Sequence, residues 1–228
     1  MVNTPTFYLQ AHHAYHSDGV SDAELRSQLK ALGVEGRRLS RLTLLSLLGA
    51  LPLSGAASSS LYLASPASSP SKYRKLLDQL VLHNTPNLLD FTASLHNAAV
   101  FHVAQALSLQ GASAFVPSTA ANFFQILYLA VCELLDQPTH DALLGWGLEQ
   151  GEEAQDGSHW YRLSTQPSAH ALARLQLVPT SESPPLPTWP VQPDFWQAMQ
   201  TWQHAVQHGL GYTLPIGNPS WVLQLVPA

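Results

Sequence analysis

The sequence predicts an α/β fold in which a layered mixed sheet carries helices on both faces. Segments with the composition of buried strands alternate along the chain with segments in which apolar residues recur every three or four positions. The length of 228 residues suits one domain, or one domain with an appendage. No internal repeat indicates a solenoid or a propeller.

In the first part of the chain, residues typical of helix N-termini indicate where helices begin. Ser21 and Glu24 form a Ser-x-x-Glu capping box, which satisfies the free amides at a helix N-terminus. Pro70 suits the first position of a later helix, because its missing N–H is not needed there. The predicted elements are a strand over residues 6–10, a helix from Asp22, an almost entirely apolar and therefore buried helix over 39–50, a strand over 60–64 and a helix from Pro70, followed by an irregular segment over 84–92.

In the second part of the chain, predicted helices and strands continue to alternate up to a proline-rich segment. An alanine-rich helix over 97–109, a strand over 114–116 and a long helix over 120–135 precede strands over 142–148, 161–163 and 172–178. Prolines interrupt residues 181–193, so we divide the chain into residues 1–180 and a short appendage, 181–228. The appendage has a helix over 194–208 and a strand over 221–226, too little for an independent domain. Its tryptophans are expected to cover an open face or to contact a partner; they are Trp189, Trp196, Trp202 and Trp221.

The composition favours a protein that is partly covered by another protein. Charged residues make up 11% of the chain, whereas ordinary soluble domains carry about 25%. The formal net charge of −5 gives no basic footprint for nucleic acid. No basic segment followed by an apolar core begins the chain, and the most apolar stretch, residues 42–53, is shorter than the ~20 residues that span a bilayer. We therefore expect a cytoplasmic protein without a membrane span.

Neither cysteine nor histidine predicts a metal site. Cys132 is the only cysteine, which excludes an internal disulfide, and we expect it to act as a small apolar residue on a helix. The histidines gather at His12, His13 and His16 and again at His204 and His208, but they lack the ligand pattern of a zinc site.

Three segments in order resemble the β-ketoacyl synthase family. The segment LSLQGASAFVPSTAANFFQILYLAV, residues 107–131, resembles the region around the family's nucleophile, with Gly111, Ser113 and Val116 in register. Upstream, SLHNAA (94–99) and RRLSRLT (37–43) resemble two further segments of ketosynthase-like proteins. In this register the position of the catalytic cysteine falls on Ala120.

The resemblance implies a thiolase-like half-fold without catalysis. It covers roughly residues 6–178, and the paired histidines of the family's second half have no counterpart after Val178. Alanine offers no nucleophile, so no catalytic residue, cofactor or metal is expected. Ser118 and Thr119 are expected to cap the helix that follows, and His96 and Asn97 to support the vacant turn. Together these features resemble chain-length factors, and most narrowly the ketosynthase-like proteins of aryl-polyene biosynthesis.

The resemblance also implies a partner. The partner is an active ketosynthase, joined as a heterodimer or as a dimer of heterodimers and supplied by an acyl carrier protein that this chain meets only indirectly. The expected dimer interface is the strand Ala112, Ser113, Ala114, Phe115, Val116 and Pro117. The expected tunnel and chain-length gate residues are Phe91, Ser94, Tyr73, Leu76, Leu77 and Leu80.

Two other classes of function stay open at this point. Ser118 is a candidate nucleophile for a small serine-dependent hydrolase or acyltransferase, provided that a histidine serves as its base. A standalone acyl-binding protein is the other alternative, and it predicts a folded monomer with a closed pocket.

Overall fold

The computed structural model describes residues 4–53, 55–85, 87–138, 141–151 and 155–228. These residues form one mixed sheet of eight strands in the order β3-β2-β4-β5-β1-β6-β8-β7. β2 pairs in parallel with β3 and β4, and the other neighbouring strands pair antiparallel. The strands are β1 (Thr6–Ser17), β2 (Ser60–Ser65), β3 (Ser113–Pro117), β4 (Asp141–Leu148), β5 (Asp156–Ser164), β6 (Ala173–Pro179), β7 (Tyr212–Leu214) and β8 (Trp221–Pro227).

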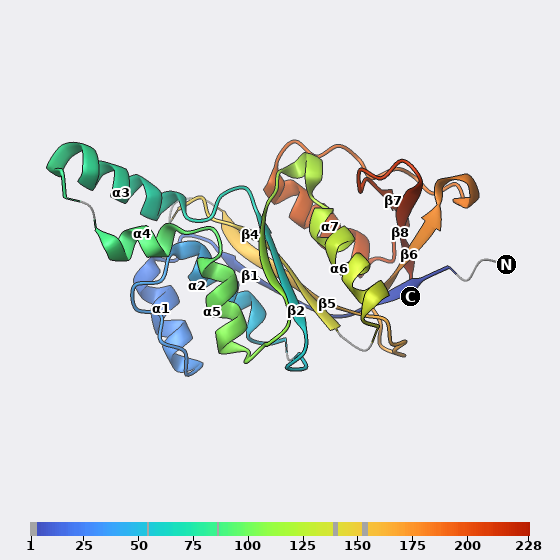
Figure 1. The fold of residues 1–228 in the computed structure, drawn as a ribbon, viewed down its shortest axis with the longest axis horizontal. Helices are drawn as coiled ribbons and strands as arrows, with labels where there is room; N and C mark the ends of the chain where they lie inside the picture. The colour runs from blue at the N-terminus through green and yellow to red at the C-terminus, as the bar shows by residue number, and fades with distance from the viewer. Residues whose placement is uncertain (1–3, 54, 86, 139–140, 152–154) are drawn as a thin grey trace.

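Helices cover both faces of the sheet, which confirms the predicted α/β class (Figure 1). α1, α2 and α5 lie on one face and α6 and α7 on the other, while α3 and α4 extend away from the sheet as an arm. Within the described residues, no helix has the length and apolar character needed to cross a bilayer. The helices are α1 (Asp22–Ala31), α2 (Arg41–Ala50), α3 (Pro70–His83), α4 (Leu88–Ser94), α5 (Ala98–Ala106), α6 (Gln125–Asp136) and α7 (Phe195–Gln207).

The central strands separate two apolar layers. Leu144 and Trp146 of β4 belong to the layer beneath α6 and α7, whereas Leu143 belongs to the layer beneath α2 and α5. Trp160 of β5 fills the second layer next to Gly145, where an added Cβ would lie 2.6 Å from the indole ring. Because β4 and β5 each contribute to both layers, a slip of one residue in either strand would exchange them, and the packing specifies the register.

β1 is much longer than the predicted strand over residues 6–10. Its second part, AHHAYHS, pairs with β5 along its length, with His12 opposite Tyr161 and His16 opposite Gly157. The same pairing extends β5 well beyond the predicted residues 161–163. This pairing with a distant strand overrides the weak strand propensity of the histidine-rich segment.

The structure differs from the sequence prediction at one helix and at one segment predicted to be irregular. The helix expected over 120–135 begins with a separate 3₁₀ turn, Ala120–Asn122, before α6 starts at Gln125. The segment expected to be irregular, 84–92, contains the start of α4, because the side chain of Asn87 accepts hydrogen bonds from the amides of Leu89 and Asp90 and caps the helix. The three-residue strand β7 was not expected at all.

Residues 181–228 continue the sheet of residues 1–180. β8 pairs with β6 over seven residues, β7 pairs with β8, and α7 packs on the layer that also holds α6. Trp189 and Trp202 are buried in this layer, and the half-buried Trp196 and Trp221 pack against it. The tryptophans of the segment therefore cover one face of the sheet.

A buried carboxylate connects two helices to the end of β4. Glu149 is 5% exposed and accepts hydrogen bonds from the amides of Leu42 and Ser71, each at 2.9 Å. These amides lie in the first turns of α2 and α3, where free N–H groups and the helix dipole favour negative charge. Burial raises the pKa of Glu149, and the hydrogen bonds from Ser71 and Leu42 oppose that rise.

A second buried charge connects α2 to the sheet and to α1. Arg41 is 2% exposed and its Nε lies 2.6 Å from Oδ2 of the fully buried Asp156 in β5. The same guanidinium donates to Asp22 at 3.0 Å and to Ser17 at 2.9 Å. Every carboxylate and hydroxyl around Arg41 thus comes from a different element, which offsets the cost of burying the ion pair.

The substitution Glu149→Gln should loosen α3 from the sheet. It replaces a charged acceptor by an amide that presents an NH₂ group to one of the two helix amides, and hydrogen bonds to charged groups contribute about 1.5–3 kcal/mol each. We expect urea unfolding to show a loss of about 2–4 kcal/mol. The control is Glu182→Gln, which changes an exposed carboxylate. Equal midpoints for both variants would contradict the role assigned to Glu149.

Candidate functional site

Ala120 lies at the turn between β3 and α6. β3 ends at Pro117, and the 3₁₀ turn that begins at Ala120 leads into α6. Thr119 caps this turn, because its Oγ1 accepts from the amide of Ala121 at 3.3 Å and its own amide donates to Oδ1 of Asn122 at 2.6 Å. A side chain at position 120 is half-buried and starts at a strand-to-helix turn.

Ser118 precedes this turn and is not its cap. Its residue is 2% exposed, and its hydroxyl donates to the carbonyl of Val116 at 3.1 Å. A serine nucleophile needs a base that takes its proton, whereas this hydroxyl already donates to a main-chain acceptor. Of the two predicted caps, Thr119 caps the 3₁₀ turn and Ser118 caps neither element. α6 itself has Phe124 at its N-cap position, without a side-chain capping bond.

The cavity around Ala120 is about 410 Å³ and offers little acid–base chemistry. Within the described part of the chain its ionisable lining residue is Asp194, whose carboxylate accepts from the amide of Gln197 at 2.8 Å and caps α7. None of the described histidines, lysines or cysteines lines this cavity. The lining residues are Pro66, Thr119, Ala120, Ala121, Gln192, Pro193, Asp194 and Phe195.

Three histidines meet between β1, β5 and α7. Nε2 of His16 lies 2.7 Å from Nε2 of His159, so one ring donates and the other accepts, and Trp196 of α7 lies against both rings. Burial lowers the pKa of His159 to about 3 and that of His12 to about 4, with smaller contributions from the neighbouring histidines. The cluster is therefore neutral at pH 7. Among the described residues, no group of histidine, cysteine or acidic side chains has an arrangement that could hold a metal ion.

β3 forms one edge of the sheet. Leu61 donates to the carbonyl of Ala112, and the backbone groups of successive residues in a parallel strand alternate in direction. The N–H and C=O groups of Ser113 and Phe115 therefore point away from β2, toward the edge. Ala112, Ser113 and Pro117 are exposed, Ala114 and Phe115 are half-buried, and Val116 is buried. The segment expected to be an interface is thus an edge strand in the described chain, with backbone groups available for another strand.

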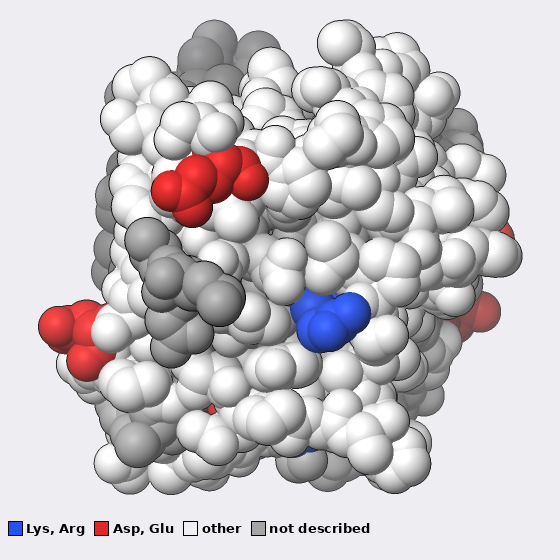
Figure 2. All heavy atoms as spheres, turned by 90° about the vertical axis from the view of Figure 1, so that its right-hand side faces the viewer, with Lys and Arg blue, Asp and Glu red and all other residues white. Residues whose placement is uncertain are grey.

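The opposite edge, β7, is covered by the chain itself. The amide of Thr213 donates to Pro187 at 2.8 Å, and the amide of Trp189 donates to Thr213 at 2.9 Å. Proline-rich residues therefore occupy the outer side of β7. Figure 2 views this end of the molecule and shows few charged side chains, in keeping with the sequence, where only Arg162 and Arg174 supply basic charge after Lys75.

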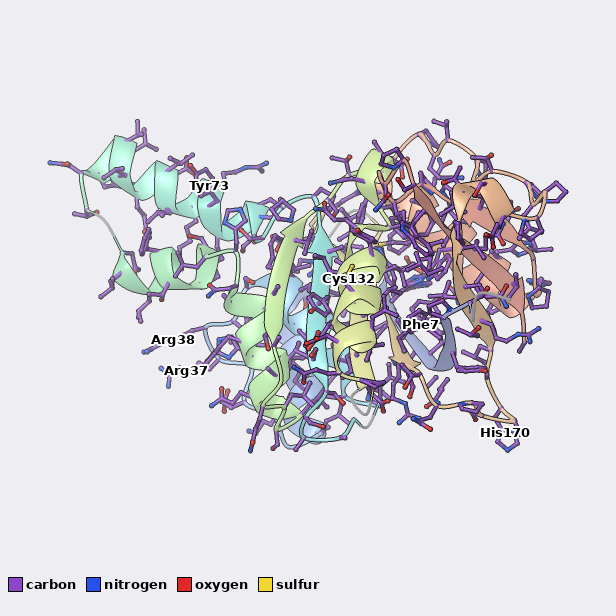
Figure 3. All side chains as sticks on the ribbon, turned by 45° about the vertical axis from the view of Figure 1, so that its right-hand side comes forward. Phe7, Arg37, Arg38, Tyr73, Cys132 and His170 are labelled. Carbon is purple, nitrogen blue, oxygen red and sulfur yellow. The ribbon has the colours of Figure 1, made fainter. Side chains whose placement is uncertain are left out.

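The arm of α3 and α4 exposes apolar side chains. Tyr73, Leu77 and Leu80 of α3 and Phe91 of α4 are each between 42% and 57% exposed. Asp90 holds the two helices together, since its carboxylate lies 3.3 Å from Nζ of Lys72 and 2.9 Å from Nζ of Lys75. Figure 3 shows Tyr73 on the arm, beside the body of the protein.

The structure brings together only part of the predicted gate. Tyr73 and Leu77 line one cavity together with His96, whereas Phe91 and Ser94 do not line it, and Ser94 donates its hydroxyl to the carbonyl of Phe91 at 2.8 Å. The half-buried Leu76 and the exposed Leu80 also lie outside its lining.

His96 and Asn97 lie at the start of α5. Both are exposed, and the ring of His96 lies edge-to-face on Phe115 of β3 at 5.5 Å between centroids. Asn97 lines a separate cavity near Arg37 and His102. The arm, His96 and the open edge of β3 therefore form one continuous surface.

Solved structures provide the comparison. Neither a family model nor a curated protein matches the chain by sequence. The ketosynthase ApeO in complex with its chain length factor ApeC from Xenorhabdus doucetiae matches with a TM-score of 0.62 at 14% identity, over 97% of this chain and 99% of the matched chain. The fold is ketosynthase-like. The structural likeness covers 97% of the chain and so extends well past residue 178, where the sequence resemblance ends.

Two further structures extend this comparison. The ishigamide ketosynthase/chain length factor matches with a TM-score of 0.58 at 14% identity, over 78% of this chain and 68% of that chain. The PfaC keto synthase-chain length factor matches with a TM-score of 0.60 at 8% identity, over 98% of this chain and 43% of that chain. The ketosynthase-like, thiolase-type half-fold predicted from the sequence is confirmed.

A thiol placed at position 120 should not restore condensing chemistry. We expect Ala120→Cys, made in a Cys132→Ser background because Cys132 is exposed, to react with iodoacetamide but to release no CO₂ from a malonyl thioester. Among the described residues, the lining offers no histidine and no cation to support such a reaction, and the carboxylate of Asp194 is engaged in capping α7. Cys132→Ser alone is the control. Release of CO₂ above that control would show that catalytic groups act on this turn.

Proposed function

We propose that this chain is a non-catalytic, chain-length-factor-like subunit that pairs with an active β-ketoacyl synthase. The observation that carries the proposal is the strand-to-helix turn at Ala120. The sequence resemblance aligns this position with the family's nucleophile, and here it carries a methyl group. A methyl group neither attacks a thioester nor exchanges a proton, so no acyl-enzyme forms at this position. The chain retains the fold while its own turn supplies no chemistry.

The surface of the chain has features that suit the binding of a partner protein. The edge strand β3 offers unpaired backbone groups beside His96 and the apolar arm. Exposed strand edges and apolar patches are the features through which proteins add a partner chain. The solved structure of ApeO with ApeC is itself a complex of a ketosynthase with a chain length factor. In this proposal β3 pairs with an edge strand of the ketosynthase.

The arm gives the subunit its role in the reaction. Phe91, Tyr73 and Leu77 would reach toward the partner and bound the tunnel into which its acyl chain grows. An acyl carrier protein would deliver the chain to the partner in the cytoplasm, and this subunit would meet the carrier only indirectly. The product class implied by the sequence resemblance is a polyene or polyketide, most narrowly an aryl polyene.

The two alternative functions have less support. The hydrolase alternative loses support because the buried hydroxyl of Ser118 donates to Val116. A standalone acyl-binding protein would remain monomeric in the presence of a ketosynthase. Measuring the affinity of the chain for a ketosynthase distinguishes this alternative from the proposal.

Ser113→Pro should weaken the heterodimer without unfolding the chain. The N–H of Ser113 points away from β2, so proline removes an outward donor and no bond of the β2–β3 ladder. We expect the Kd for the partner ketosynthase to rise at least about tenfold, as measured by biolayer interferometry. Ser113→Ala, which retains the N–H, is the matched control. Equal affinity for the two variants would place the interface elsewhere.

Phe91→Ala should lengthen the product or broaden its length distribution. The side chain is 49% exposed, so its truncation should change stability by less than about 0.5 kcal/mol, while it removes an aromatic ring from the tunnel. Mass spectrometry of the products made by the reconstituted complex measures the effect. Leu82→Ala, which shortens an apolar side chain that is 71% exposed on the same arm, should leave the distribution unchanged. An unaltered distribution with Phe91→Ala would remove Phe91 from the gate.

A further inference from the structure

A cavity of about 600 Å³ lies where the arm joins the body of the protein. It is formed by the loop between β2 and α3, by the first turns of α3 and by His96 ahead of α5. Its volume lies within the range of about 300–1,000 Å³ that small-molecule sites occupy. It is separate from the cavity that surrounds Ala120, although Pro66 lines both.

One part of the lining is polar and lacks a negative charge. Ser69 is 2% exposed, and its hydroxyl has no hydrogen-bond partner in the described chain. It occupies the N-cap position of α3 but makes no side-chain capping bond. A buried hydroxyl without a partner is unfavourable, and native proteins seldom tolerate such a group without a reason. An external acceptor or donor would satisfy it.

Among the described residues, the charged lining group of this cavity is Arg74, and the titratable ones beside it are His96 and Tyr73. No aspartate or glutamate lines the cavity, and among the described residues no ion pair joins Arg74 to a carboxylate. On the same helix, by contrast, Lys72 and Lys75 are both occupied by Asp90. The guanidinium of Arg74 is therefore available, and its planar fork matches a carboxylate.

The rest of the lining is apolar. Tyr73 and Leu77 lie one turn apart on α3, and Pro66 and Pro70 close the loop side. Tyr73 and Leu77 are 57% and 42% exposed, so these side chains are largely in water unless something covers them. A ligand that suits this cavity has an anionic head for Arg74 and an apolar tail for Tyr73 and Leu77.

We propose that this cavity binds a medium-chain carboxylate. The carboxylate would accept hydrogen bonds from Arg74, from the hydroxyl of Ser69 and from a ring N–H of His96, and the hydrocarbon tail would lie along Tyr73 and Leu77. The proposal goes beyond the proposed function, because it requires neither a partner subunit nor the gate at Phe91.

Isothermal titration calorimetry of the full chain with decanoate tests the proposal. Decanoate should bind saturably, whereas decanol, which has the tail without the charge, and acetate, which has the head without the tail, should bind at least about tenfold more weakly. Arg74→Gln should weaken decanoate binding about ten- to a hundredfold, because it removes a charge-assisted pair. Equal binding of decanol and decanoate, or no saturable binding of decanoate, would overturn the proposal.

Two further variants locate the site. Ser69→Ala should weaken decanoate binding about three- to tenfold while the urea midpoint of the free chain stays the same or rises, because the hydroxyl has no internal partner. Arg37→Gln is the matched control: Arg37 lines a different cavity next to α4, and Figure 3 shows it well away from Tyr73. Binding that is lost with Arg37→Gln and retained with Arg74→Gln would move the ligand to that other cavity and overturn the assignment.

Discussion

Glu149 brings a negative charge to a place that is only 5% exposed, and this is tolerated because two helices begin there. An isolated carboxylate would be expensive to bury, and an isolated pair of helix N-termini would leave amides unpaired. The helix amides stabilise the buried carboxylate, and the carboxylate gives these amides their hydrogen-bond acceptor. Since one of the two helices is α3, the direction in which the arm leaves the sheet depends on this contact. The cavity at Ser69 and the exposed gate side chains depend on it in turn.

Within the arm, a second carboxylate, that of Asp90, joins two helices. The ion pairs of Asp90 with Lys72 and Lys75 hold α4 against α3 where few apolar contacts are available. Burial alone would raise the pKa of Asp90, but Lys75 and Lys72 lower it below its ordinary value. None of the residues of α3 is buried, so charges rather than an apolar core set the shape of the arm. An arm built in this way leaves its apolar side chains free for contact with other molecules.

Local signals in the sequence predicted what depends on neighbouring residues. The capping box at Ser21, the start of α3 at Pro70 and the strand-to-helix turn at Ala120 were all visible as short patterns. The full length of β1 was not, because it depends on pairing with β5, which lies more than a hundred residues away. The link from Glu149 to α2 and α3 was missed for the same reason. Around the candidate site, the resemblance identified Tyr73, Leu77 and His96, whereas Ser69 and Arg74 became recognisable only when the structure showed an unpartnered hydroxyl beside an available cation.

The two edges of the sheet have opposite characters, and this difference limits what the chain can assemble into. Along β7, the hydrogen bonds of Thr213 with Pro187 and Trp189 occupy the outer side, while β3 keeps its backbone groups free in the part of the chain that the structure describes. A subunit with two open edges can polymerise, since each added copy presents a new edge. A subunit with one open edge can pair with a single strand of a second subunit. The joined sheet then has covered strands at both ends. Growth by sheet extension therefore stops at a pair, and a chain with few surface charges to keep it dispersed is protected from forming fibres.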